Sequence, residues 1–255
     1  MTADARPWSV VATRNGDGDE AANEGDAEAD AQAEADLARR LGWAKQAILA
    51  AALVFLGIAI GLVVARDRPP GAGSVDVGFL QDMLTHHDQA LGVATLVIAN
   101  GEDPTVGSYA REVLTFQGYE TGVMTQMLDE WGQSRDDRSD QAMAWMGMGV
   151  PVERMSGLLT EEQMDELSAA RGAELDALFL DHMAEHHRGG LHMAEYAATN
   201  ADDEDVRELA ARTARNQAGE INEYRALAER NGYEIEIEPA TVPAAIAEAG
   251  ETGGG

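Results

Sequence analysis

The chain has 255 residues, with 46 acidic and 18 basic side chains that give a formal net charge of −28, and it contains no cysteine. This charge argues against nucleic acid as a partner, because phosphate binding needs clustered lysine and arginine. The lack of cysteine excludes disulfides and thiolate metal sites, so any metal would be held by histidine, methionine, carboxylate, amide or backbone groups.

The N-terminal part of the chain consists of a polar tail and one long apolar run. Residues 1–45 are rich in alanine, aspartate, glutamate and glycine. We expect a disordered acidic tail there, because such a composition buries too little apolar surface to order itself. Residues 46–66 contain a stretch without charge, from Ala47 to Ala65, whose helical length of about 28 Å matches the bilayer core.

The apolar run is predicted to be a transmembrane signal anchor. A cleaved signal peptide is the alternative, since Val63-Val64-Ala65 resembles a cleavage site, but the preceding tail is longer and more acidic than an ordinary signal peptide. Arg39, Arg40 and Lys45 precede the run, which favours a cytoplasmic N-terminus. Both interpretations place the rest of the chain outside the cytoplasm, and the anchor makes it a single-pass protein of the cell membrane.

Four helices are predicted after a linker, residues 67–74, that is rich in proline and glycine. Two of their starts have clear signals. Asp103 precedes Pro104 at the second helix, and Thr160 forms a capping box with Gln163 at the third. The expected helical ranges are 75–99, 104–131, 160–198 and 204–231.

The first and third helices carry the same motif, D-x-x-F-L-x-x-M-x-x-H-H, at residues 76–87 and 176–187. When the sequence is shifted by 100 residues, 15 of 57 aligned positions are identical. Two repeated helix-turn-helix halves predict an all-α, ferritin-like four-helix bundle over residues 75–232. The methionine-rich segment 133–159 is then the crossover between the halves, and residues 233–255 are predicted to be a frayed tail.

Each half places polar side chains on a helix face that should be buried. Counting about 100° per residue puts His87 near the centre of one apolar stripe, and Gln117 and Glu120 in the middle of the next. The second half repeats this pattern with His187, Gln217 and Glu220. An unpaired ionised carboxylate is costly to bury. In one interpretation, therefore, Glu120 pairs with His187, or His87 with Glu220, and the pairs fix the helix register.

In the other interpretation these side chains hold a metal ion between facing helices. The candidate ligands are Met83, His86, His87, Glu120, Met124, His182, Met183, His186, His187, Met193 and Glu220. Histidine and methionine without cysteine suit copper, because thioethers favour Cu(I) and imidazole accepts either oxidation state. Zinc stays open, whereas a di-iron site would want a glutamate on every helix.

The methionines of the crossover are a second set of candidates. They are Met143, Met146, Met148 and Met155. In a flexible loop they could capture Cu(I), and in a packed one they would fill the end of the bundle.

These motifs resemble the domain-of-unknown-function 305 family over residues 75–232. The matching pieces are Phe79-Leu80-x-x-Met83-x-x-His86-His87, Gln117-x-x-Glu120-x-x-x-Met124, the methionine-rich centre, and the second copy through His186-His187 to Met193-Ala194. The resemblance implies a ferritin-like extracytoplasmic protein and, as in some members, copper binding or copper tolerance. Two methionines of the family pattern are replaced, by Val93 in the first half and by Tyr224 in the second.

The favoured hypothesis is a membrane-anchored extracytoplasmic protein that binds a metal ion, with copper preferred. The alternative is a structural or interaction bundle with buried His–Glu pairs and no metal. A third hypothesis, an oxidase on a ferritin-like scaffold, lacks the necessary carboxylates. We expect no enzyme, because the sequence contains no nucleophile elbow, phosphate loop or dinucleotide fingerprint. A homo-oligomer is compatible with each hypothesis.

Overall fold

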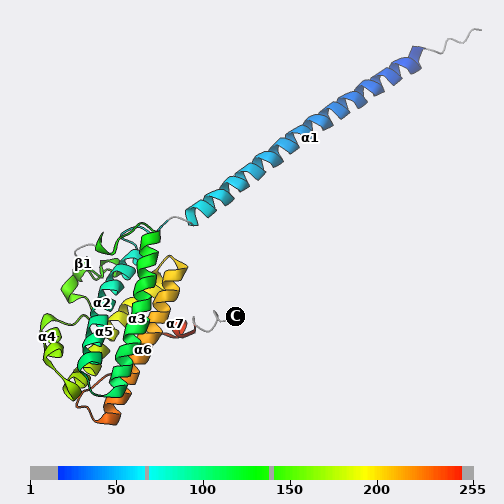
Figure 1. The fold of residues 1–255 in the computed structure, drawn as a ribbon. Helices are drawn as coiled ribbons and strands as arrows, with labels where there is room; N and C mark the ends of the chain where they lie inside the picture. Colours follow the sequence, from blue (N-terminus) through cyan, green and yellow to red (C-terminus); the bar gives the residue numbers. More distant parts are fainter. Residues whose placement is uncertain (1–16, 67–68, 138–140, 249–255) are drawn as a thin grey trace, which may run out of the picture. The chain divides into compact units, whose positions relative to one another are not determined.

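The computed structural model describes residues 17–66, 69–137 and 141–248. The chain divides into two units, residues 1–68 and 69–255. The first contains a single helix, and the second contains the helical bundle (Figure 1).

The first unit is the helix α1, Asp17–Arg66. Its segment Ala31–Gly61 has a mean hydropathy of 1.9 and no buried residue in its most apolar window. Large apolar side chains of this helix are exposed, for example Phe55 at 72% and Ile48 at 70%. This helix is long and apolar enough to cross a membrane, and a signal sequence near the N-terminus would pass the same test.

The structure differs from the predicted disordered tail. Helix α1 already begins at Asp17, within the segment 1–45. Alanine and glutamate, which are frequent there, are strong helix formers, so the helix extends N-terminally from the apolar run. Residues 1–16 lie outside the described part of the chain.

The second unit is built around four long helices, which lie side by side (Figure 1). They are α2 (Val75–Asn100), α3 (Pro104–Glu130), α5 (Gly172–Asn200) and α6 (Glu204–Asn231). Helix α3 packs on α2, α6 packs on α5, and α2 contacts α5 at the centre. Equivalent side chains of the two halves fill the core, for example Phe79 and Phe179, both fully buried. The predicted ferritin-like bundle of two repeated halves is confirmed.

The predicted helix starts are also present. The Asp103 side chain accepts a hydrogen bond from the Thr105 amide, with Pro104 in the first turn of α3. Thr160 and Gln163 form both bonds of a capping box. These bonds satisfy amide groups that the first turn of a helix leaves without partners.

The third predicted helix, 160–198, is not continuous, so that prediction was wrong. Helix α4 (Glu161–Ala169) ends at the extended residue Ala170, and α5 begins at Gly172, which has a φ of +59°. A side chain at Gly172 would also lie 2.7 Å from a Glu102 carboxylate oxygen. Glycine permits this turn because it has no Cβ.

The crossover is a compact segment with little regular structure. It contains the 3-10 helices η1 (Arg135–Asp137), η2 (Ala144–Met146) and η3 (Val152–Arg154) and the strands β1 (Gln141–Ala142) and β2 (Val150–Pro151), which pair antiparallel.

A carboxylate of α2 anchors this crossover. Asp82 accepts hydrogen bonds from the Met143 amide at 2.6 Å and from the Trp145 indole at 2.7 Å. Met143, Met146 and Met155 are buried, whereas Met148 is exposed. Three of the four crossover methionines therefore pack against the bundle, as a filling role requires.

The C-terminal segment also differs from its prediction as a frayed tail. Ile237, Ala240 and Ile246 are buried, the last in the short helix α7 (Ala244–Glu248). The Asn222 side chain forms hydrogen bonds with both the carbonyl and the amide of Ala240, at 2.8 and 3.1 Å. The irregular spacing of these apolar residues has no helical or strand period, so it carried no sequence signal.

The first residue of each repeat motif binds the other half. The Asp76 carboxylate, on α2, accepts a hydrogen bond from the Asp203 amide at 2.8 Å, in the turn before α6. The Asp176 carboxylate, on α5, accepts from the Glu102 and Asp103 amides at 3.0 and 2.7 Å, in the turn before α3. Both aspartates are fully buried. Each half therefore holds the helix-connecting turn of its counterpart.

Candidate functional site

A buried polar layer crosses the middle of the bundle. We define it as His86, His87, Gln117, Glu120, His186, His187, Thr213, Gln217 and Glu220, contributed by all four long helices. The four histidines are fully buried, and the most exposed member is Glu220, whose side chain is 15% exposed. The helical phase of the sequence correctly predicted the burial of His87, Gln117 and Glu120.

In the first half, His87 and Glu120 form a hydrogen-bonded pair. The distance between His87 Nε2 and Glu120 Oε2 is 2.9 Å. The other carboxylate oxygen of Glu120 accepts a hydrogen bond from the Thr213 hydroxyl at 3.1 Å. Thr213 has no counterpart in the repeat, since Val113 occupies the equivalent position, and the sequence therefore gave no reason to expect it.

In the second half, His187 and Glu220 are closer together but less well aligned. His187 Nε2 lies 2.6 Å from Glu220 Oε2, but the two atoms do not have the geometry of a regular hydrogen bond. The pairs form within each half, so the predicted pairing of Glu120 with His187, or of His87 with Glu220, was wrong. Within a half the two helices are direct neighbours, and helical phase alone cannot identify a neighbour.

His86 and His186 stack at the centre of the bundle. Their ring centroids are 3.7 Å apart, and His86 Nε2 lies 3.0 Å from the His186 carbonyl oxygen. A carbonyl only accepts, so His86 carries its proton on Nε2, and its Nδ1 retains a free electron pair. Burial lowers the pKa of both imidazoles well below the usual range, and the neighbouring histidines lower it further. Both rings are therefore neutral at physiological pH.

We expect the stability of the fold to fall in mild acid because of His86 and His186. Since their folded-state pKa lies below the unfolded value of about 6.5, the unfolded chain binds more protons below that pH. The free energy of unfolding is fully retained above about pH 6.5 and then decreases by up to about 1.4 kcal/mol per pH unit for each imidazole. Urea unfolding between about pH 7.5 and pH 5 should show a shallower decrease in a His86→Gln, His186→Gln variant. Equal slopes would contradict the neutral buried pair.

Several polar atoms of the layer have no hydrogen-bond partner among the described residues. They are Nδ1 of His86 and His87, both ring nitrogens of His186 and His187, and both side-chain amide atoms of Gln117 and Gln217. Gly190 packs directly on Gln217 and on His86, because a Cβ there would lie 2.8 Å from His86 Cε1. Most buried polar groups have a partner, so these atoms leave the layer with unused hydrogen-bonding or ligating capacity.

The four predicted methionine ligands are buried in the hydrophobic core. Met83, Met124, Met183 and Met193 are at most 1% exposed. At the two positions where the family pattern has methionine, the buried residues are Val93 and Tyr224. The Tyr224 ring lies 5.7 Å from that of His187, and burial raises the pKa of its hydroxyl well above the usual value.

His182 lies apart from this layer. Its Nε2 is 3.7 Å from a Glu166 carboxylate oxygen on α4, and its side chain lines a surface pocket. His186, one turn further along α5, is fully buried and stacks on His86 instead. Of the predicted histidine ligands, His182 therefore lies outside the buried polar layer. Across the described ranges, no three histidine, aspartate or glutamate side chains converge closely enough to hold a metal ion.

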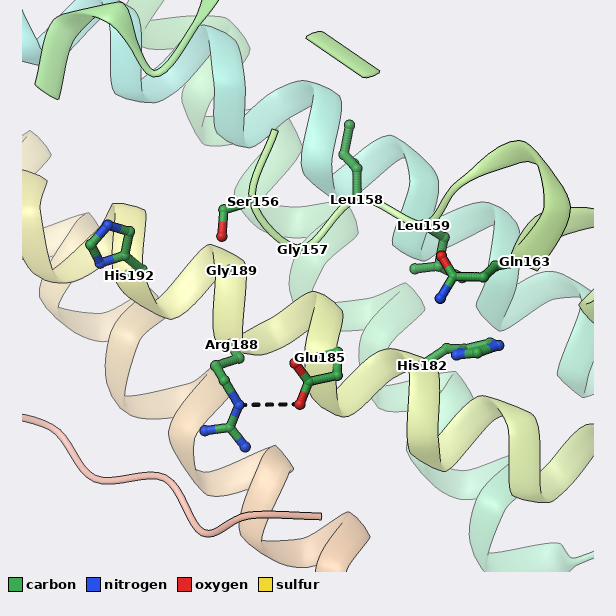
Figure 2. A pocket seen from close by; sticks show the side chains of 10 residues that line it. All are labelled: Ser156, Gly157, Leu158, Leu159, Gln163, His182, Glu185, Arg188, Gly189 and His192. Carbon is green, nitrogen blue, oxygen red and sulfur yellow. Dashed lines mark hydrogen bonds and ion pairs between the residues drawn. The ribbon is translucent and has the colours of Figure 1, made fainter. Parts of the chain in front are cut away.

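The surface pocket lies between α5 and the end of the crossover, and has a volume of about 480 Å³ (Figure 2). Its lining residues are Ser156, Gly157, Leu158, Leu159, Gln163, His182, Glu185, Arg188, Gly189 and His192. The sequence did not predict this pocket, because the residues of 156–159 follow no helical or strand period.

The fold has known relatives. The family model described as "Domain of unknown function (DUF305)" matches residues 76–228. A DUF305 protein of Streptomyces coelicolor, described as secreted, is 31% identical, with 67% of this chain and 99% of that chain covered and a TM-score of 0.60.

Two further solved structures are less similar. A DUF305 fragment from Deinococcus radiodurans is 28% identical, with 63% and 99% covered and a TM-score of 0.54. CopM in its Cu(I)-bound form is 23% identical, with 62% and 97% covered and a TM-score of 0.46. No curated protein matches the chain significantly.

Proposed function

The chain belongs to the DUF305 family, and on this premise we propose that it is a membrane-anchored extracytoplasmic protein that binds copper in its buried polar layer. Helix α1 supports the anchor, because it is long and apolar enough to span a bilayer. A relative described as secreted supports the location outside the cytoplasm.

The observation that carries the copper proposal is the set of buried imidazole nitrogens without partners. Glu120 lies against Nε2 of His87, and Glu220 lies against Nε2 of His187. With the proton on Nε2, each Nδ1 has a free electron pair. A carboxylate that orients an imidazole through its second nitrogen is the usual support of a metal-bound histidine. The glutamates would thus orient the ligands rather than bind the ion themselves.

The donor set favours copper over zinc. A structural zinc site would need about four protein ligands and a catalytic one about three, whereas no three histidine or carboxylate groups converge in the described residues. Buried thioethers on the same helices, from Met83 and Met183, are the soft ligands that select Cu(I). One or two imidazoles completed by a thioether would suit this ion.

A binding role fits the layer better than an oxidase role. Ferritin-like di-iron enzymes place a glutamate on each of four helices. The layer contains Glu120 on α3 and Glu220 on α6, while α2 and α5 contribute histidines. We therefore propose that the protein is not an enzyme.

A purely structural role is the competing candidate, and one observation favours it. The His87–Glu120 pair is already well formed, with Thr213 as an additional donor to the carboxylate. Such pairs can fix the register of packed helices. In that case the layer would bind no ion.

The test is a titration of the full-length protein in detergent micelles with Cu(I) under anaerobic conditions, in competition with a chromophoric chelator. We expect at least one copper ion per chain and a higher melting temperature. A ligand at 100 times its Kd stabilises the fold by about 2.7 kcal/mol, which corresponds to about 5–10 °C for a domain of this size. Loss of all copper to the chelator, with an unchanged melting temperature, would contradict the proposal and favour the structural role.

A further inference from the structure

The surface pocket is separated from the buried polar layer by a single stretch of backbone. Gly157, in the coil of residues 156–159, and Gly189, on α5, both line it. A Cβ on Gly157 would lie 3.0 Å from His86 Nε2, and one on Gly189 would overlap the backbone of Ser156. Gly157 has a φ of +85°, which also favours glycine. The backbone of the coil therefore contacts α5 on one side and His86 on the other.

The sides of the pocket carry groups that bind metal ions. His182 and His192 lie at opposite ends of the pocket, with Glu185 between them along α5 (Figure 2). The only basic side chain of the lining, Arg188, binds Glu185 at 3.3 Å and the Glu238 carbonyl at 2.7 Å. Imidazole and carboxylate groups next to solvent can capture a cation before it is dehydrated.

The coil of residues 156–159 has few hydrogen bonds, one of them a turn bond from the Leu158 amide to the Met155 carbonyl at 3.1 Å. The Leu159 amide and carbonyl bind the Gln89 side chain at 2.7 and 3.0 Å. The Ser156 amide donates to the thioether sulfur of Met143 at 3.5 Å, a weak interaction. A coil with so few bonds opens at lower cost than a helix of the bundle. The Met143 sulfur also places a soft ligand beside the coil.

We propose that this pocket is the entrance through which copper reaches the buried polar layer, with His182 and His192 as the first ligands. The inference rests on the proposed function, because it needs an ion bound in the layer. The four histidines of the layer are fully buried, so an ion must cross a layer of protein to reach them. Two other surface pockets, one lined by Gly78 and Trp145 and one by Arg225 and Pro239, contain no histidine.

The absence of cysteine from the chain makes a direct test available. A Ser156→Cys variant carries one thiol, which a bulky maleimide can modify so that the pocket is blocked. The matched control is Ser168→Cys, modified in the same way, since Ser168 is exposed on α4 and does not line the pocket. The probe is Cu(I), and the readout is the rate at which excess chromophoric chelator removes copper from the loaded protein.

We expect the label at position 156 to slow copper release and loading at least tenfold and to leave the equilibrium affinity unchanged, because the buried ligands are the same. The label at position 168 should have no effect. Equal rates in the two labelled proteins would overturn the entrance while leaving copper binding intact. If no variant retains copper at equilibrium, the proposed function fails and the entrance with it.

A second variant keeps the test independent of the label. His182→Gln with His192→Gln removes the two capture ligands and leaves the glycines and the layer in place. We expect slower loading, again by at least tenfold, with an unchanged final occupancy. Loading at the wild-type rate would exclude these two imidazoles as the first ligands.

Discussion

Replacing His87 and His187 with alanine together is expected to abolish copper binding and to destabilise the bundle. Two imidazole ligands are lost, and Glu120, which is 5% exposed, is left without its main partner. Leaving one member of a buried pair alone typically costs about 3–5 kcal/mol. Copper retained after dialysis should fall to background, which means at least a hundredfold weaker binding, or about 2.7 kcal/mol.

A glutamine variant separates the two effects. In His87→Gln with His187→Gln, the side-chain amide can still donate to the glutamates, but it has no imidazole nitrogen for a soft ion. We expect near-normal stability in urea together with loss of copper. Wild-type copper binding by this variant would contradict the assignment of these histidines as ligands. Normal copper binding by the unfolding-prone alanine variant would place the ion elsewhere.

The second large effect is expected at Gly189, where alanine should destabilise the protein strongly. A Cβ at this position overlaps the Ser156 carbonyl group and the Gly157 amide nitrogen, which are all backbone atoms. The crossover would have to move away from α5. Overpacking a core costs about 1–3 kcal/mol in the free energy of unfolding. We expect about 3 kcal/mol here, because backbone atoms cannot rotate away as a side chain can. This loss corresponds to a decrease of about 6–12 °C in melting temperature.

Gly92 provides the matched control on α2. A Cβ there meets no atom within 4 Å, so Gly92→Ala should raise stability by about 0.5–1 kcal/mol through helix propensity. Thermal unfolding followed by circular dichroism distinguishes the two variants. A Gly189→Ala protein as stable as the wild type would show that the coil does not rest on this helix.

The bundle was predictable from the sequence because helical periodicity and a repeat at an offset of 100 residues both report on buried faces. The same periodicity placed His87 and Glu120 in the interior. It could not identify their partners, because the apolar stripe shows which face of a helix is buried but not which other helix packs against that face. The pairing across halves therefore had no better support than the pairing within halves that the structure contains.

Other features lay beyond the repeat. Thr213 binds Glu120 although its counterpart is Val113. Asp82 anchors the crossover, while its counterpart, His182, lines the pocket. Positions where the halves differ have no internal copy to draw attention to them.

The exchanged bonds of Asp76 and Asp176 have a consequence for the origin of the chain. Each carboxylate completes a turn that belongs to the opposite half. A peptide of half this length would leave its own turn amides without an acceptor, and two copies related by a two-fold axis would supply it reciprocally, as in an isologous dimer. The present molecule thus has the arrangement of such a dimer, with both halves contained in one chain.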